Sequence, residues 1–171
     1  FIRTYLERDV AAFGFKLPAQ KLQKLWTMLA YQQGSILNSS DLGRSLELST
    51  QTTNRYIDIL ADLLLVRKLL PYEANINKRL VKSPKVYIRD SGIVHALLQL
   101  ESLDQLLSHH ILGNSWEGFV IENIAAVAPW HTSLCYYRTG GGAEIDLVIT
   151  FPNQEIWTVE IKRSLKPKLS K

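Results

Sequence analysis

The amino-acid sequence predicts a mixed α+β fold in two parts, a helical part and then a strand-rich part, within 171 residues. Apolar residues recur three and four positions apart over residues 22–30, as on one face of a helix. Apolar and polar residues alternate over residues 143–151 and 155–163, as in half-buried strands. We therefore expect a helical module over residues 1–100 and a second module over residues 101–171.

The helical module contains the outline of a helix-turn-helix. After an expected helix at residues 1–16 and another that ends near Gly34, the cluster Asn38-Ser39-Ser40 caps a short helix. Ser49 caps a longer helix whose apolar positions extend to Leu64. A helix, a short helix, a tight turn and a longer helix then follow one another in the order of that motif.

Two short strand-like runs follow the helix-turn-helix, at residues 65–70 and 85–88. They are joined by the segment from Pro71 to Pro84, which is rich in basic residues. Two strands with a basic connection behind a helix-turn-helix predict a winged helix. Residues 91–112 are then expected to form short helices that lead to the second module.

The second module is expected to run in the order helix, strand, strand, strand. The helix covers residues 115–128, and the strands cover residues 134–138, 143–151 and 155–163. We expect the buried side of this helix to be formed by Trp116, Phe119, Val120, Ile124 and Val127.

Positive charge gathers in the first module. The chain has a net charge of +4, but residues 1–100 alone hold 14 Lys and Arg against 8 Asp and Glu. Between positions 67 and 89 the one acidic residue is Glu73. The basic residues of this cluster are Arg67, Lys68, Lys78, Arg79, Lys82, Lys85 and Arg89. Such a density is typical of a phosphate-binding surface, and the alternative is a solvated rim whose lysines aid solubility.

The helix-turn-helix and the basic cluster together predict DNA binding. The start of the second helix of the motif carries polar side chains that suit phosphates and base edges. These are Thr50, Gln51, Thr52, Asn54 and Arg55, and further salt-sensitive phosphate contacts are expected from Lys78, Arg79, Lys82 and Lys85. The alternative is a protein-docking module, because winged helices also bind proteins and a polar first turn is common in helices.

Composition excludes several classes of protein. The single cysteine, Cys135, excludes an internal disulfide framework and a multi-cysteine zinc site. The longest nearly uninterrupted apolar run, Leu60 to Val66, is far shorter than the roughly 20 residues that cross a bilayer. With no signal peptide at its start, the chain is expected in the reducing cytoplasm, without a membrane partner. Because the first residue is Phe1 rather than methionine, we expect a piece of a longer polypeptide.

Acidic residues of the second module predict a metal site. Alternation along the last two strands, joined by a short hairpin, places Asp146 beside Glu160 and Lys162. Converging carboxylates can share a hard divalent cation, Mg²⁺ or Mn²⁺, while a lysine orients water or stabilises developing charge. A further carboxylate from the preceding helix, Glu117 or Glu122, would complete the shell. The alternative is a solvated hairpin face with alternating charges.

The same residues resemble the PD-(D/E)XK nuclease superfamily. The resemblance lies in Asp146, the stretch Glu160-Ile161-Lys162 and the helix residue Glu117. More specifically, the chain resembles the C-terminal domain of unknown function found behind the ATPase module of many bacterial and archaeal AAA-type ATPases. The matching stretches are Tyr5-Leu6-Glu7-Arg8-Asp9, Leu29-Ala30, Gly34, Leu37-Asn38, Lys78-Arg79-Leu80, Lys82-Ser83-Pro84-Lys85-Val86-Tyr87, Asp90-Ser91-Gly92, Trp116-Glu117, Phe119-Val120, Tyr137-Arg138-Thr139, Glu144-Ile145-Asp146-Leu147 and Glu160-Ile161-Lys162.

This resemblance implies a winged helix followed by a truncated restriction-endonuclease-like α/β domain. It also implies an ATPase module as a partner, which would bind ATP in a part of the protein outside this sequence. For the site, it implies that Glu117, Asp146 and Glu160 hold the metal and that Lys162 is a catalytic lysine beside Asp146 and Glu160 in a phosphodiesterase. Because members of the superfamily can lose activity while keeping the fold, the alternative is a docking module with a vestigial nuclease fold.

Overall fold

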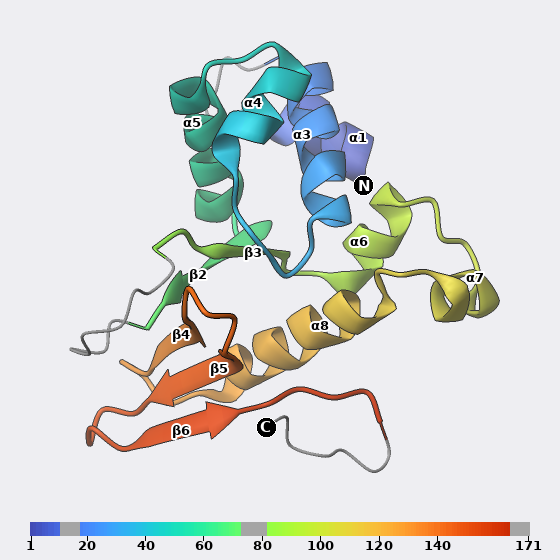
Figure 1. The fold of residues 1–171 in the computed structure, drawn as a ribbon. Coiled ribbons are helices and arrows are strands. Elements are labelled where there is room, and N and C mark those ends of the chain that lie inside the picture. The colour runs from blue at the N-terminus through green and yellow to red at the C-terminus, as the bar shows by residue number, and fades with distance from the viewer. Residues whose placement is uncertain (11–17, 73–81, 165–171) are drawn as a thin grey trace.

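The computed structural model describes residues 1–10, 18–72 and 82–164. It confirms a mixed α+β fold, built on one six-stranded sheet (Figure 1). The helices are α1 (Ile2–Thr4), the π-helix η1 (Tyr5–Asp9), α3 (Ala19–Tyr31), α4 (Ser39–Leu46), α5 (Thr50–Asp62), α6 (Ser91–Leu97), α7 (Leu103–Ser108) and α8 (Leu112–Val127). The strands are β1 (Ser35–Ile36), β2 (Val66–Pro71), β3 (Lys85–Ile88), β4 (Ser133–Arg138), β5 (Glu144–Thr150) and β6 (Ile156–Val159).

The sheet joins strands from both expected modules. Its strand order is β1-β3-β2-β4-β5-β6. Strands β2 and β4 run parallel, with Leu70 opposite Cys135 and Pro71 opposite Tyr136, while the other neighbouring pairs are antiparallel. The backbone N–H of Tyr72 extends this contact by donating to the carbonyl of Tyr136 at 2.6 Å. The helical part and the strand-rich part therefore share hydrogen bonds across the middle of one sheet.

Two apolar cores lie on opposite faces of this sheet. Strand β3 contributes to both, because successive side chains of a strand point to opposite faces. Val86 and Ile88 pack among the helices of the first part, while Tyr87 packs with Ile121 of α8 and Leu147 of β5. Figure 1 shows the two sides, with α3, α4 and α5 above β2 and β3 and α8 crossing beneath them. All four residues of β3 are buried, so this strand fixes how the two cores sit against each other.

Helices α4 and α5 begin at the capping residues that the sequence indicates. The side chain of Asn38 accepts the backbone N–H of Asp41 at 3.3 Å, and that of Ser49 accepts the N–H of Thr52 at 3.1 Å. The turn between the two helices passes through Glu47 at a φ of 54°. Glycine at position 43 lets the backbone of Leu48 come close to α4, because a Cβ there would lie 2.8 Å from the Leu48 carbonyl oxygen.

The buried face of α8 differs from the predicted one. Its buried residues are Ser115, Gly118 and Ile121. Of the predicted residues, Val120 and Ile124 are half-buried and Ile124 packs against the core, whereas Trp116 and Phe119 are exposed and Val127 is 83% exposed. The reason is close packing of small residues. A Cβ on Gly118 would lie 2.7 Å from Nε2 of Gln33 and 3.2 Å from Cδ1 of Tyr87. A count of large apolar residues overlooks such a face, because serine and glycine contribute no apolar signal.

Two strands also differ from the sequence-based boundaries. Strand β1 is an addition, pairing with β3. Strand β6 ends at Val159 rather than continuing to Arg163, and beyond it a side chain replaces a backbone partner: the carboxylate of Asp146 accepts the N–H of Ile161 at 2.8 Å. The expected N-terminal helix is described only to residue 10, and its remainder lies outside the described residues. Within the described parts of the chain, none of the helices is long and apolar enough to cross a membrane.

Candidate functional site

A polar cavity of about 690 Å³ lies where α8, β3, β5 and the end of β6 meet. Its ionisable lining residues are Lys85, Glu117, Glu144, Asp146 and Glu160. We call it the acidic pocket, because four of these five side chains are carboxylates. The structure therefore brings together the three residues that the sequence predicts as metal ligands, Glu117, Asp146 and Glu160.

Strand pairing places Asp146 and Glu160 on neighbouring strands. The last paired residues of β5 and β6 are Leu147 and Val159, so Asp146 comes just before one and Glu160 just after the other. The Asp146 carboxylate also accepts the N–H of Ile161, which holds the chain beyond β6 against β5. Lys162 lies beside this point, since its Nζ is 2.5 Å from Oε1 of Glu160.

Helix α8 contributes Glu117, and two donors from β3 hold it. Oε1 of Glu117 accepts hydrogen bonds from Nζ of Lys85 at 3.0 Å and from the hydroxyl of Tyr87 at 2.5 Å. The same Nζ of Lys85 lies 2.6 Å from Oε1 of Glu144 on β5. One ammonium group is therefore shared between two carboxylates that come from different elements.

The electrostatic setting follows from burial and this sharing. Burial raises the pKa of Glu117 above its usual value, and the charge of Asp146 adds to the shift, while Lys85 and Tyr87 oppose it. Burial alone would lower the pKa of Lys85, but Glu117 and Glu144 outweigh it and raise that pKa. Burial and the nearby carboxylates also raise the pKa of Tyr87, so its hydroxyl stays a neutral donor. Lys85 is therefore a charged ammonium among four carboxylates, with Arg138 3.3 Å from Oε2 of Glu144 and Lys162 at Glu160 as further cations at the rim.

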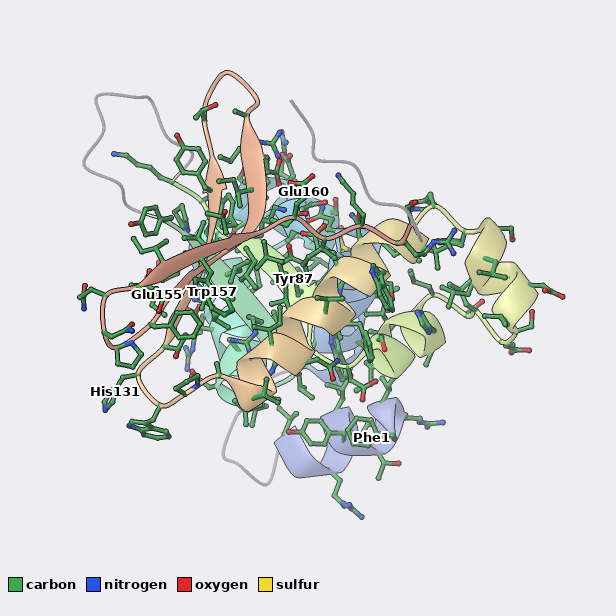
Figure 2. All side chains as sticks on the ribbon, turned by 90° about the horizontal axis from the view of Figure 1, so that it is seen from below. Phe1, Tyr87, His131, Glu155, Trp157 and Glu160 are labelled. Atoms are coloured by element: carbon green, nitrogen blue, oxygen red, sulfur yellow. The ribbon has the colours of Figure 1, made fainter. Side chains whose placement is uncertain are left out.

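The arrangement does not fit a resident divalent cation. In residues 1–10, 18–72 and 82–164, no three Asp, Glu, His or Cys side chains are grouped as metal ligands. The carboxylates have protein donors instead: Glu117 has Lys85 and Tyr87, and Asp146 has the Ile161 amide. Figure 2 shows α8 crossing this face, with Tyr87 of β3 and Glu160 after β6 labelled. Binding of Mg²⁺ or Mn²⁺ stays a prediction.

The pocket residue Glu144 and Tyr87, the buried partner of Glu117, were not among the predicted site residues. A signal for Glu144 exists, because alternation along its strand places it on the same face as Asp146. No local signal points to Tyr87, whose partner Glu117 is 30 residues away. The choice between Glu117 and Glu122, which the sequence leaves open, is settled in favour of Glu117 as the pocket residue. Glu122 instead pairs with Arg67 and Arg89.

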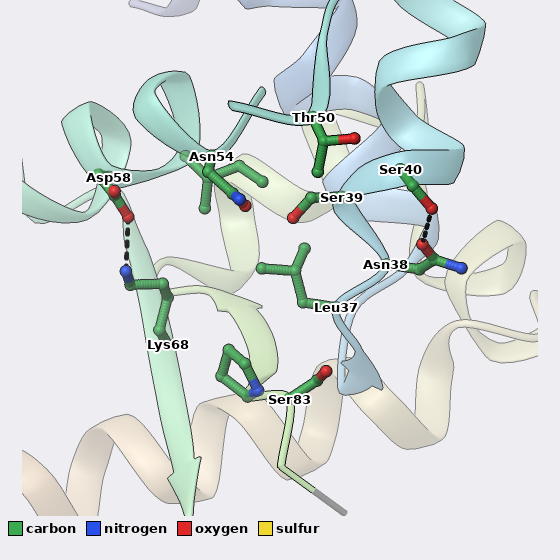
Figure 3. Close-up of a pocket in the computed structure, with 11 residues that line it drawn as sticks. Leu37, Asn38, Ser39, Ser40, Thr50, Asn54, Asp58, Lys68 and Ser83 are labelled. Carbon is green, nitrogen blue, oxygen red and sulfur yellow. Dashed lines mark hydrogen bonds and ion pairs between the residues drawn. The ribbon is translucent and has the colours of Figure 1, made fainter. Parts of the chain in front are cut away.

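The residues predicted to contact DNA fall into three places. Along the start of α5, Thr50, Gln51, Asn54 and Arg55 are exposed and Thr52 is half-buried beside Ser49. A cavity of about 530 Å³ lies at this helix start, and Figure 3 shows it between Thr50, Asn54, Ser39, Ser83 and Lys68. Of the basic residues, Lys82 is exposed, and Lys78 and Arg79 lie outside the described residues.

Lys85 is the exception among the predicted DNA contacts. Only 3% of its surface is exposed, and its ammonium group points into the acidic pocket between Glu117 and Glu144. Its sequence neighbourhood is basic, but its spatial neighbourhood is acidic. Lys85 therefore belongs to the acidic pocket and not to the exposed basic surface.

The chain matches two protein-family models, each of a domain of unknown function. A family model described as "Domain of unknown function (DUF8612)" matches residues 1–104, more than half of the chain. The chain belongs to the DUF8612 family. A second model, "Domain of unknown function (DUF4143)", matches residues 112–171 of this DUF8612 protein, beginning at the first residue of α8. The two models thus meet between residues 104 and 112, although the sheet continues from one region into the other.

Two curated mycobacterial proteins are similar to this DUF8612 protein over its whole length. They are "Uncharacterized protein Rv2008c" of Mycobacterium tuberculosis and "Uncharacterized protein Mb2031c" of Mycobacterium bovis, each 44% identical over 172 residues. The chain spans 38% of the length of these relatives. No solved structure matches the chain significantly.

Proposed function

We propose that this DUF8612 protein is the nucleic-acid-binding region of a longer prokaryotic AAA-type ATPase. In this proposal residues 39–88 act as a winged helix and the second part is a nuclease-like fold that serves for docking. The observation that carries the proposal is the exposed polar start of α5, beside a cavity that also contains Lys68. The ATPase context rests on the family resemblance, and the greater length of the mycobacterial relatives leaves room for a nucleotide-binding module.

The chemistry of the α5 start suits a nucleic acid. Thr50, Gln51, Asn54 and Arg55 offer hydroxyl, amide and guanidinium groups that can reach base edges and phosphates. The helix spans 13 residues, and recognition helices of this kind place their N-terminal residues in the major groove.

Positive charge lines the same cavity from the strand side. Nζ of Lys68 is 2.5 Å from Oδ1 of Asp58 on α5, and both side chains are partly exposed, so a phosphate can replace that contact at little cost. Lys82 is exposed next to Ser83, which also lines the cavity. The helix start and Lys68 thus present polar and positive groups around one opening (Figure 3), and Lys82 directly precedes Ser83 of its lining.

A second candidate function is phosphodiester cleavage. It is favoured by the gathering of Glu117, Asp146 and Glu160 around one cavity, with Lys162 bound to Glu160. The docking role is preferred because the carboxylates are engaged by protein donors and are not grouped as metal ligands within the described residues.

Fluorescence anisotropy of a labelled DNA duplex tests the first proposal with the full chain. Binding is expected to weaken steeply between about 50 and 200 mM salt, because phosphate contacts release counterions. Arg55→Ala and Lys82→Ala should each weaken binding and lower the salt slope by about one phosphate contact. Arg3→Ala, an exposed arginine on α1 that pairs with Glu7, is the matched control. A flat salt response, or binding unchanged in both variants, would contradict the proposal.

A cleavage assay separates the second candidate from the first. The wild-type chain and Asp146→Asn are incubated with plasmid DNA and Mg²⁺ or Mn²⁺, and nicking is measured on a gel. The docking proposal expects no nicking by either protein. Nicking by the wild type that is absent from Asp146→Asn would establish the second candidate instead.

A further inference from the structure

The acidic pocket already contains a cation that belongs to the chain. We propose that Lys85 is the internal counter-cation of this pocket: it positions Glu117 and Glu144 and keeps divalent cations out. This role goes beyond nucleic-acid binding, because Lys85 is buried and takes no part in the exposed surface at α5.

The contacts of Lys85 are those of a fixed charge. Its Nζ lies 2.6 Å from Oε1 of Glu144 and 3.0 Å from Oε1 of Glu117, and 5.7 Å from the centre of the Tyr136 ring. The side chain is 4% exposed. A buried ammonium is costly unless it is paired and hydrogen-bonded, and two carboxylates and an aromatic face provide that compensation here.

The backbone of Lys85 cannot easily move away from the pocket. On one side Lys85 pairs with Ile36 of β1, and on the other it pairs with Leu69 of β2. Helix α8 is held near it by Gly118, which allows the helix to approach Tyr87 closely. The ammonium group therefore connects three elements, β3, α8 and β5, at fixed positions.

This arrangement excludes a divalent cation by charge and by occupancy. A metal ion bound by Glu117 and Glu144 would lie within a few ångströms of the Lys85 ammonium and would be repelled by it. The carboxylate oxygens of Glu117 and Glu144 that point at Lys85 are also no longer free to serve as ligands. Without the charge of Lys85, the excess of carboxylates over cations would be larger, and the pocket would attract a hard ion that prefers oxygen ligands.

Substitution of Lys85 by methionine tests the inference. Binding of Mn²⁺ is measured by electron paramagnetic resonance and by the rise in Tm at millimolar Mn²⁺, with the full chain. Lys85→Met should bind Mn²⁺ at least about tenfold more tightly than wild type, a difference of about 1.4 kcal/mol. Adding Asp146→Asn to Lys85→Met should remove most of this gain, because Asp146 lines the same pocket.

Two control variants separate charge from packing. Lys85→Arg keeps the cation and should bind Mn²⁺ as poorly as wild type. Lys68→Met removes a lysine that pairs with Asp58 away from the acidic pocket, and should leave Mn²⁺ binding unchanged. If Lys85→Met does not fold, Lys85→Gln removes the charge but keeps a donor for Glu117 and Glu144, and it should likewise bind Mn²⁺ more tightly than wild type.

Two results would overturn the inference. One is wild-type protein that binds Mn²⁺ as tightly as Lys85→Met, which would instead favour the phosphodiester-cleavage candidate. The other is a folded Lys85→Met protein, or folded Lys85→Gln protein, that gains no Mn²⁺ binding. Failure of DNA binding in the anisotropy experiment would leave this inference intact, since Lys85 does not reach that surface.

Discussion

Two glutamates on the same helix, Glu117 and Glu122 of α8, have opposite surroundings. Their side chains are nearly equally covered, with 16% and 14% exposed. Glu122 pairs with two arginines, Arg67 on β2 and Arg89 after β3. Glu117 shares a single lysine with a second carboxylate and takes a hydrogen bond from Tyr87. At similar exposed fractions, the two glutamates differ in the ratio of cations to carboxylates around them.

The pKa shifts of the two carboxyl groups follow this ratio. Burial alone would raise the pKa of Glu122, but hydrogen bonds and charges from Arg67 and Arg89 hold it below its usual value. Burial raises the pKa of Glu117 and the charge of Asp146 adds to the rise, and the opposing effects of Lys85 and Tyr87 do not cancel it. At one end of α8, the ion pairs of Glu122 hold the helix against β2 and the end of β3. At the other end, Glu117 lines the acidic pocket, where carboxylates outnumber cations.

Removing each glutamate in turn should have unequal effects on stability. Glu122→Gln leaves two partly buried guanidinium groups without a counter-charge, and we expect a loss of about 2 to 3 kcal/mol in the free energy of unfolding. Glu117→Gln keeps an acceptor for Tyr87 and relieves the cost of a buried charge, so its loss should be about 1 kcal/mol or less. Urea unfolding of both variants measures the difference. Equal losses in the free energy of unfolding would show that the ratio of cations to carboxylates does not determine how much each glutamate stabilises the fold.

A pair of glycine substitutions on α8 sharpens the comparison at the Glu117 end. Gly118→Ala places a Cβ 2.7 Å from Nε2 of Gln33, whose amide is bound to the backbone of Ile88 on both sides. We expect α8 to shift and about 1 to 2 kcal/mol of stability to be lost. Gly113→Ala on the same helix meets nothing within 4 Å and should gain up to about 1 kcal/mol from helix propensity. Thermal melts give the Tm of each variant relative to wild type. Shifts of the two Tm values in the same direction would contradict this packing.

The smallest expected effect is the pH dependence of the Glu122 end. Because the pKa of Glu122 is lowered on folding, the unfolded chain binds a proton at a higher pH than the folded chain does. The stability that this group contributes is therefore present above its usual pKa of 4.5 and is lost as the pH falls through the lower folded value. Calorimetric Tm values for Glu122→Gln should fall less steeply in acid than those of wild type. An identical acid profile would mean that Glu122 does not titrate as described.

The sequence predicted best where the signal is local. Capping residues marked the starts of α4 and α5, and alternation with a short hairpin brought Asp146 next to Glu160. These features depend on neighbours within one turn or one hairpin, so the pattern of side chains determines them. The mixed α+β class followed from the same local periodicities.

The sequence did not predict contacts between residues far apart in the chain or packing by small residues. Lys85 sits in a basic stretch, and nothing local shows that Glu117, 32 residues later, would take its charge. Arg67 and Glu122 are 55 residues apart and meet because α8 packs against the sheet face on which β2 places Arg67 and Leu69. The buried face of α8 was missed because Ser115 and Gly118 pack by being small, which large-residue periodicity does not register.

The parallel pairing of β2 with β4 limits how the two family regions can be separated by recombination. The two family regions meet between residues 104 and 112, an obvious crossover point by sequence alone. A protein that contained only one of the two regions would have β2 or β4 as an edge strand with unpaired N–H and C=O groups. Such an edge can pair with strands of other molecules and cause aggregation. We therefore expect the two regions to be inherited together and to be transferable only as a pair. Chimaeras in which only one region is exchanged should accumulate in inclusion bodies.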